Sequence, residues 1–158
     1  MARDTLHIAL DSAVNKLASF APASKDYRLD RFSELLITLN ITAAERPAAQ
    51  TYDFYLITGD GYSEWDLVHF PQIAAAGPAR YTARVQSLQL PQAVTAGAPG
   101  VATVAPSIIN TLTTNAPKTL AAGVVAHGPW GNMLRYELVV VGSLTTGINY
   151  TVQVQARE

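Results

Sequence analysis

The nearest thing to a chemical cluster in the sequence lies around Trp65, and its members are Asp60, Glu64, Asp66 and His69. In a strand over residues 62–70, alternation would place Glu64, Asp66 and Val68 on one face and Trp65, Leu67 and His69 on the other. Two neighbouring carboxylates can serve as a general acid and base or bind a hard cation. The competing interpretation is a solvated hairpin face with Trp65 packed inward, and the sequence favours it.

Other candidate residues are isolated. His7, His69 and His127 lack the spacing of metal ligands, so single structural roles are expected for them. Arg80 and Arg84 share one face of a predicted strand, where they could bind phosphate or pair with acids at an interface. Pro129 and Trp130 lie in a Gly-Pro-Trp-Gly loop, and Trp130 is either a core anchor or a partner-binding residue. We therefore predict Trp130, Pro129, Arg80 and Arg84 as partner-binding residues.

Residues 85–134 carry one formal charge, Lys118, in a stretch dominated by Ala, Thr, Val, Gly and Pro. A solvated loop would normally be charged, and a catalytic site needs titratable groups. A long neutral segment of small residues is better suited to being covered by another protein surface. We expect the interface to lie between Leu90 and Trp130.

Composition excludes several functions. The chain has no Cys, which rules out disulfides, thiolate metal sites and a cysteine nucleophile. The net charge of -1 gives no electrostatic reason to bind nucleic acid or an anionic membrane. No apolar window is long enough for a membrane helix, the first residues do not read as a secretory signal, and no phosphate-binding, hydrolase or zinc-protease motif occurs. We expect no enzymatic activity, no cofactor and no metal.

The elements expected to position these residues are short strands. Apolar and polar residues alternate without exception over 148–157, and a similar alternation occurs over 80–86 and, apart from Leu36, over 35–42. Residues 134–141 and 148–156 are predicted to form a C-terminal hairpin, and 51–58 pairs with 62–70 around Gly59-Asp60-Gly61. Weaker strands are expected at 101–104, 108–112 and 120–126, separated by prolines. A strand over 5–10 is preferred to a helix at the N-terminus.

Eight to ten short strands with almost no helix indicate one all-β domain over residues 1–158, an antiparallel sandwich or barrel with long Ala/Thr/Gly/Pro-rich loops.

A resemblance supports this class. The stretch Tyr52–Gly61, followed by Trp65–Ile73 and Arg80–Val85, resembles head-decoration (cement) proteins of tailed bacteriophages. The resemblance implies a β-sandwich of jelly-roll type on the outer surface of a virion, assembled in the host cytoplasm. It also implies a homo-dimer or homo-trimer that binds the major capsid protein and links neighbouring subunits, without catalytic residues.

Two other kinds of protein fit the same pattern. A carbohydrate-binding β-sandwich would display several aromatic side chains on one face, and the two Trp and seven Tyr could supply them. Another virion structural protein, of the tail or of head completion, would share the composition. A cupin-like enzyme would need a His and Glu cluster whose spacing is missing here.

Overall fold

The computed structural model is built of strands in two sheets, and it describes residues 4–45, 50–73, 76–87, 105–108, 118, 120–127 and 130–158. Within this part of the chain, one 3-10 turn, η1 (Leu29–Arg31), is the helical element. The strands are β1 (Thr5–Lys16), β2 (Lys25–Asp26), β3 (Glu34–Ala44), β4 (Thr51–Gly59), β5 (Glu64–His69), β6 (Ala79–Gln86), β7 (Ala105–Ile108), β8 (Val124–His127), β9 (Met133–Val141) and β10 (Ile148–Arg157).

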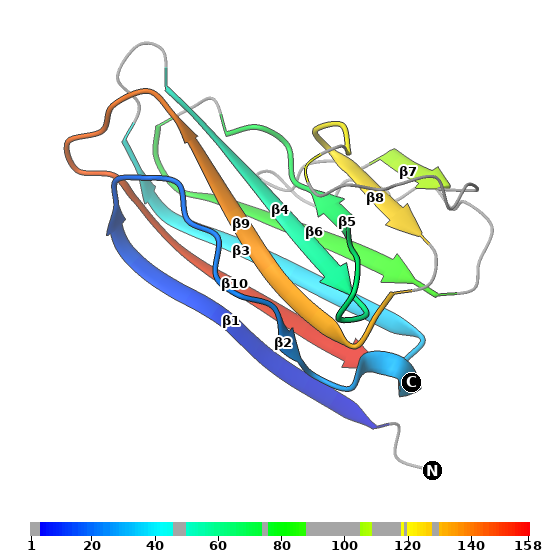
Figure 1. The fold of residues 1–158 in the computed structure, drawn as a ribbon. Helices are drawn as coiled ribbons and strands as arrows, with labels where there is room; N and C mark the ends of the chain where they lie inside the picture. Colours follow the sequence, from blue (N-terminus) through cyan, green and yellow to red (C-terminus); the bar gives the residue numbers. More distant parts are fainter. Residues whose placement is uncertain are drawn as a thin grey trace.

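The strands form two layers. The first sheet, sheet A, has the order β1-β10-β3-β6, and the second, sheet B, has the order β2-β9-β4-β5-β8-β7. Figure 1 shows sheet B lying across sheet A, with β7 and β8 on the side of sheet B beyond β5. The predicted β-sandwich is confirmed.

The pairing identifies the sandwich as a jelly roll. Strands pair in nested order, β1 with β10, β2 with β9, β3 with β6 and β4 with β5, all antiparallel. This is a long hairpin rolled up so that β10 also pairs with β3 and β9 with β4. Strands β7 and β8 are inserted between β6 and β9, and they extend sheet B beyond β5.

Each sheet turns one apolar face inward, as alternation requires. On β10 the odd-even pattern is complete, because the buried residues Ile148, Tyr150, Val152, Val154 and Ala156 alternate with more exposed ones. Leu35, Ile37, Leu39 and Ile41 of β3 are buried in the same way, and they are at most 1% exposed. Burying each such side chain contributes about 1.5–3 kcal/mol, so these faces hold the two layers together.

The predicted C-terminal hairpin is wrong. Strands β9 and β10 are adjacent in sequence but lie in different sheets, with β9 beside β4 and β10 between β1 and β3. Alternation fixes which face of each strand is buried. The same alternation fits two strands that pair within one sheet and two strands that lie in different sheets and pack face to face. The crossing connection is fastened by Glu45, whose carboxylate accepts the backbone N–H groups of Thr145, Thr146 and Gly147.

Some of the remaining predicted strands are confirmed and others differ from the structure. The N-terminal strand is confirmed and longer than predicted, and the 51–58 with 62–70 hairpin is present as β4 and β5. The predicted strand at 120–126 overlaps β8, whereas β7 contains Pro106, which was expected to separate strands. A proline is tolerated there because β7 is an edge strand. The strand predicted at 101–104 lies outside the described residues.

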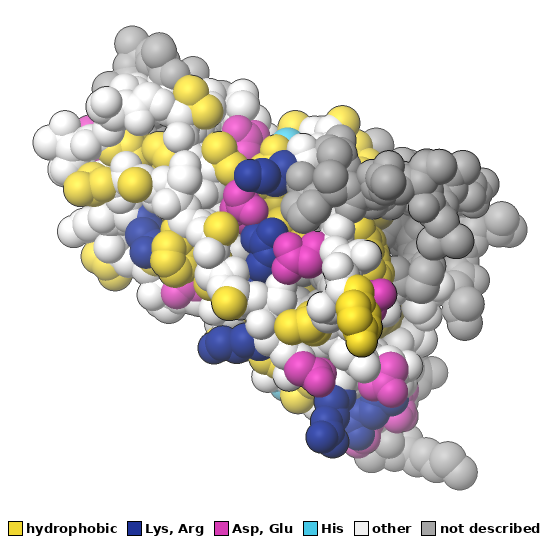
Figure 2. Space-filling view, in the orientation of Figure 1, with side chains coloured by type: hydrophobic (Ala, Val, Ile, Leu, Met, Phe, Trp, Pro, Cys, Tyr) yellow, Lys and Arg dark blue, Asp and Glu magenta, His cyan; other side chains and the backbone are white. Residues whose placement is uncertain are grey.

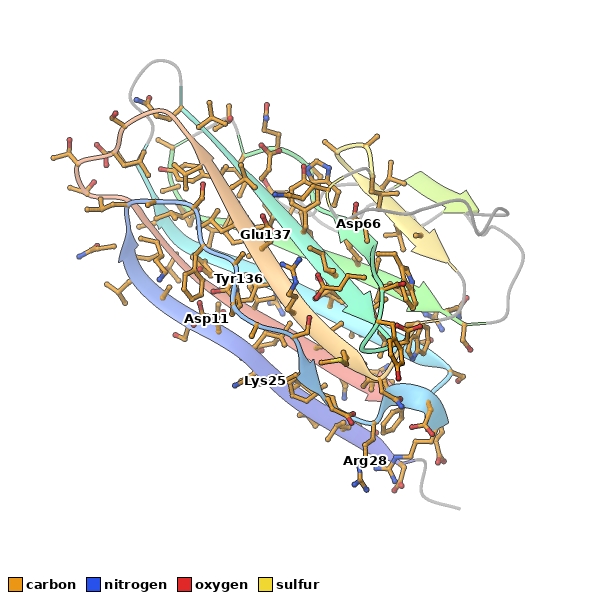
Figure 3. The ribbon with its side chains drawn as sticks, in the orientation of Figure 1. Asp11, Lys25, Arg28, Asp66, Tyr136 and Glu137 are labelled. Carbon is orange, nitrogen blue, oxygen red and sulfur yellow. The ribbon has the colours of Figure 1, made fainter. Side chains whose placement is uncertain are left out.

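A carboxylate at the edge of the core is satisfied by two tyrosines. A β-bulge between Ala9 and Asp11 turns Asp11 inward, where the hydroxyl groups of Tyr136 and Tyr150 donate to it. The two hydroxyl oxygens are 3.0 Å apart. Figure 3 shows Asp11 and Tyr136 close to one another. Burial, with the hydrogen bond to Asp11, raises the pKa of Tyr136 far above its ordinary value.

The face assignment of β10 is tested by a pair of substitutions at neighbouring positions. Val152→Asp places an unpaired carboxylate in the core and should lower the free energy of unfolding by several kcal/mol. Gln153→Asp changes an exposed position and should cost less than about 1 kcal/mol. Urea unfolding of both variants is the measurement, and equal losses would contradict the assignment.

The buried tyrosine hydroxyls predict sensitivity to alkali. Tyrosines of the unfolded chain ionise near pH 10, whereas Tyr136 in the folded protein keeps its proton to higher pH. The unfolded state therefore releases protons first, and stability should fall as pH rises above about 10. Tyr136→Phe should make that decline shallower in urea unfolding between pH 8 and 11. Tyr62→Phe, at a residue 98% exposed, is the control and should leave the slope unchanged.

Candidate functional site

The ionisable residues of sheet B form one connected network on its outer face. A β-bulge at Leu67 lets Val68 pair with Leu56 while Asp66 pairs with Ile57. The bulge shifts the alternation by one residue, so His69 lies beside Tyr55 on the same face as Glu64 and Asp66. The prediction that His69 shares a face with Trp65 is therefore wrong, because alternation counted along the chain cannot anticipate an extra residue.

Asp66 and His69 fasten a segment of the neutral connection to the sheet. Asp66 is 2% exposed and accepts the backbone N–H groups of Lys118 at 2.8 Å and Leu120 at 2.9 Å. The His69 Nδ1 is 2.7 Å from the Leu120 carbonyl oxygen, and its Nε2 is 3.2 Å from Asp53 Oδ1. Asp66, the acid predicted as half of a carboxylate pair, thus holds backbone groups and is closed off from solvent.

The second half of the network is ionic. Arg135 of β9 lies between Glu64, at 2.8 Å, and Glu137, at 2.9 Å. Its hydrogen bonds hold the pKa of Glu64 below the usual value. Burial alone would raise the pKa of Glu137, but hydrogen bonds from Arg135 and Lys118 outweigh it and the pKa is lowered.

Lys118 is the single formal charge of residues 85–134, and it forms an ion pair within the molecule. Its Nζ lies 2.9 Å from Glu137 Oε1. The connection is thereby tied down by its one charge, and Figure 2 shows the basic and acidic groups gathered side by side over the middle of this face. Within the part of the chain that the structure describes, no group of three metal-ligating side chains converges.

The two arginines predicted to bind a partner lie on the other sheet. Arg80 and Arg84 are exposed on the outer face of sheet A, four residues apart on β6. Arg84 pairs with Glu34 through its Nε at 2.6 Å, whereas Arg80 has no ion-pair partner among the described residues.

On the outer face of sheet A the side chains form rows across the four strands, and among the described residues no strand or helical turn covers them. Its outward positions in register are Ser12, Thr151, Asn40 and Arg80 in one row, Ala9, Gln153, Thr38 and Thr82 in the next, and His7, Gln155, Leu36 and Arg84 in the third. None of these residues is buried and none is acidic. The nearest acid, Glu34, is shared between Arg84 and Arg157. This face is mostly neutral and slightly basic.

The remaining predicted residues are placed differently. Trp130 is half-buried against the core, and its Nε1 donates to the Leu29 carbonyl oxygen at 3.1 Å. It therefore anchors η1 and is not an outward position of sheet A. The next residue, Gly131, passes so close to Gly59 that a Cβ atom would meet the Gly59 carbonyl oxygen, which explains the glycine after the tryptophan. Pro129 and most of the segment from Leu90 to Trp130 lie outside the described residues.

The aromatic residues do not form a binding platform. Every Trp, Tyr and Phe of the chain lies in the described ranges, and among them Tyr62 and Phe20 are exposed. Tyr55 is outward on sheet B but is stacked on His69, with ring centroids 3.9 Å apart. No helix among the described residues is long and apolar enough to cross a bilayer.

The hydrogen bonds that Asp66 accepts predict a local effect of its substitution on hydrogen exchange. Asp66→Asn removes the charge that holds the Lys118 and Leu120 amides, so their hydrogen exchange should accelerate by tenfold or more. The buried site should also lose about 1–3 kcal/mol of stability. Asp60→Asn is the matched control, because Asp60 likewise accepts two backbone N–H groups, those of Tyr62 and Ser63, in a different turn. Unchanged exchange at Leu120 in Asp66→Asn would contradict this role.

Comparison with known proteins yields little similarity. No family model and no curated protein matches the chain. Among solved structures, the chain is similar to one from the naturally occurring empty particles (top component) of cowpea mosaic virus, with a TM-score of 0.40 and 12% sequence identity. The alignment covers 98% of this chain and 85% of that chain.

Proposed function

We propose that this protein is a structural component of a virus particle, and specifically a decoration protein that binds the outer surface of a tailed-phage capsid. In this role it links neighbouring subunits of the major capsid protein and performs no catalysis. The observation that carries the proposal is the outer face of sheet A, which is broad, regular, open and free of acids in its first three rows.

The chemistry of the two sheets supports a binding role over a catalytic one. Three ionisable residues of sheet B are buried: Asp66, His69 and Glu137. The first two bond to backbone groups of the connection, and Glu137 pairs with Lys118 and Arg135. They stabilise the fold and offer no open position to a substrate. On sheet A, the exposed side chains are amides, hydroxyls and arginines, which suit hydrogen bonding and ion pairing to a protein surface. The partner surface is expected to carry carboxylates opposite Arg80 and Arg84.

The neutral connection supports the same role. Its described part carries one charged side chain, Lys118, which is half-exposed and paired with Glu137 of sheet B. A protein that packs against a shell benefits from surface that loses little hydration energy on contact, since buried unpaired charges are costly.

The carbohydrate-binding alternative is less well supported. Sugar-binding faces rely on exposed aromatic rings, but the outward positions of sheet A contain none. The most exposed ring, Tyr62, lies alone at the tip of the β4–β5 hairpin.

A charge reversal tests the proposal. Undecorated capsids, assembled from the major capsid protein of the same phage, are mixed with the purified protein, and bound protein is measured by co-sedimentation. Arg80→Glu should weaken binding by about tenfold, which corresponds to about 1.4 kcal/mol. Lys25→Glu is the matched control, because Lys25 is also exposed but lies on β2 of the other sheet. Absence of binding by the unmodified protein, or equal loss in both variants, would overturn the proposal.

A further inference from the structure

The four edge strands of the sandwich are protected unequally. Edge strands expose unpaired backbone N–H and C=O groups that can pair with another strand, and proteins usually block them. In sheet B the edges are β2, which has two residues, and β7, which has four and contains Pro106. In sheet A, β6 lies next to β8 of the other sheet. The fourth edge, β1, has twelve residues and no proline, and among the described strands its one hydrogen-bonded neighbour is β10.

Exposed apolar side chains gather beside this edge. Among the described residues the exposed large hydrophobic ones are Val14, Leu17, Phe20, Tyr62 and Val141. All but Tyr62 lie at the end of β1, in the connection after it, or at the end of β9. The connection runs along β9, since Ser19 bonds to Val140 and Phe20 bonds to Leu138. Figure 2 shows hydrophobic side chains over this side of the molecule.

We propose that two copies of the protein pair through β1, antiparallel across a two-fold axis, so that sheet A continues from one copy into the other. Another strand beside β1 would supply hydrogen-bond partners for its unpaired backbone N–H and C=O groups. A second copy of the protein supplies such a strand by symmetry. The exposed Val14, 73% accessible in the single chain, would then be covered by the first half of the partner's strand.

The bulge in β1 restricts the register. Leu6 and Ile8 face inward before the bulge, whereas Asp11 and Ala13 face inward after it. In an antiparallel pair of β1 strands, residues that face inward in one copy lie opposite residues that face inward in the other only under one condition. Residues before the bulge of one copy must pair with residues after the bulge of the other. The two-fold axis therefore passes near Leu10, and Ala9 and Ser12 of the two copies lie close together on the outer face.

This arrangement deepens the proposed function, on which the following consequence rests. The two-fold axis of an antiparallel strand pair is perpendicular to the sheet, so both outer faces of sheet A point to the same side. A dimer joined in this way offers two copies of the binding face to one shell. Two linked contacts can bridge neighbouring subunits and bind far more tightly than one.

The first test is a charge placed at the edge. Ala9→Lys adds a lysine beside the axis in each copy, with no acid opposite, and like charges across paired strands repel. Sedimentation should show the unmodified protein at about twice the 16.9 kDa chain mass and Ala9→Lys at the single-chain mass. Gln153→Lys is the control, because Gln153 pairs with Ala9 and is exposed on the same face, one strand further in. A monomeric unmodified protein, or an oligomer that Ala9→Lys leaves intact, would overturn the proposal.

The second test exploits the absence of cysteine. A variant with Ala9→Cys and Ser12→Cys should form a disulfide between two copies under mild oxidation, located by mass spectrometry of the linked peptides. The control carries Gln153→Cys and Thr151→Cys, which are the register partners of the same two positions on β10. In the proposed dimer these are separated by three strand spacings, about 14 Å, which is too far for a disulfide. Equal cross-linking in both variants would count against β1 pairing.

The two proposals fail separately. A β1-paired dimer that does not bind capsids would overturn the decoration function and leave the dimer standing. A protein that binds capsids equally well as unmodified protein and as Ala9→Lys, with no dimer in either, would retain the function and overturn the β1 interface.

Discussion

The mutual burial of one apolar face from each sheet is the interaction on which the molecule depends. Strands β3 and β10 supply almost fully buried residues from sheet A, and Tyr52, Phe54 and Leu56 of β4 supply them from sheet B. Because side chains alternate, this burial commits every other residue to an outer face. The properties of those two outer faces, one closed and one open, then decide what the protein can do.

The outer face of sheet B is closed by polar chemistry. Asp66 and His69 bind backbone groups of Lys118 and Leu120, and Glu137 binds the side chain of Lys118. Buried carboxylates are tolerated there because each accepts hydrogen bonds from amides, arginine or lysine. A neutral connection is thus fixed to a charged face, and the ionisable residues that looked most like a reactive site are used for structure.

The outer face of sheet A is left open, and its neutral grid has the qualities of a contact surface. Amide and hydroxyl side chains can lose water and form hydrogen bonds to a partner at lower cost than charges can. The exposed edge β1 lies beside this face. The proposed contact surface and the proposed self-pairing edge belong to the same sheet, an arrangement suited to holding two neighbours together.

The sequence by itself determined the class of fold, most strand positions and which side of each strand is buried, because alternation is a local property of the chain. It also determined that Arg80 and Arg84 share a face. It predicted the pairing of β4 with β5 but not that of β9 and β10, since residues 133–157 satisfy the alternation rule as a hairpin or as two strands in different sheets. Two bulges, near Leu10 and Leu67, each shifted the alternation by one residue and thereby placed Asp11 and His69. The partners of Trp130 and Lys118 likewise depended on segments far away in the sequence. Only the tertiary structure decided these matters, because pairing, bulges and coverage arise from contacts between distant residues.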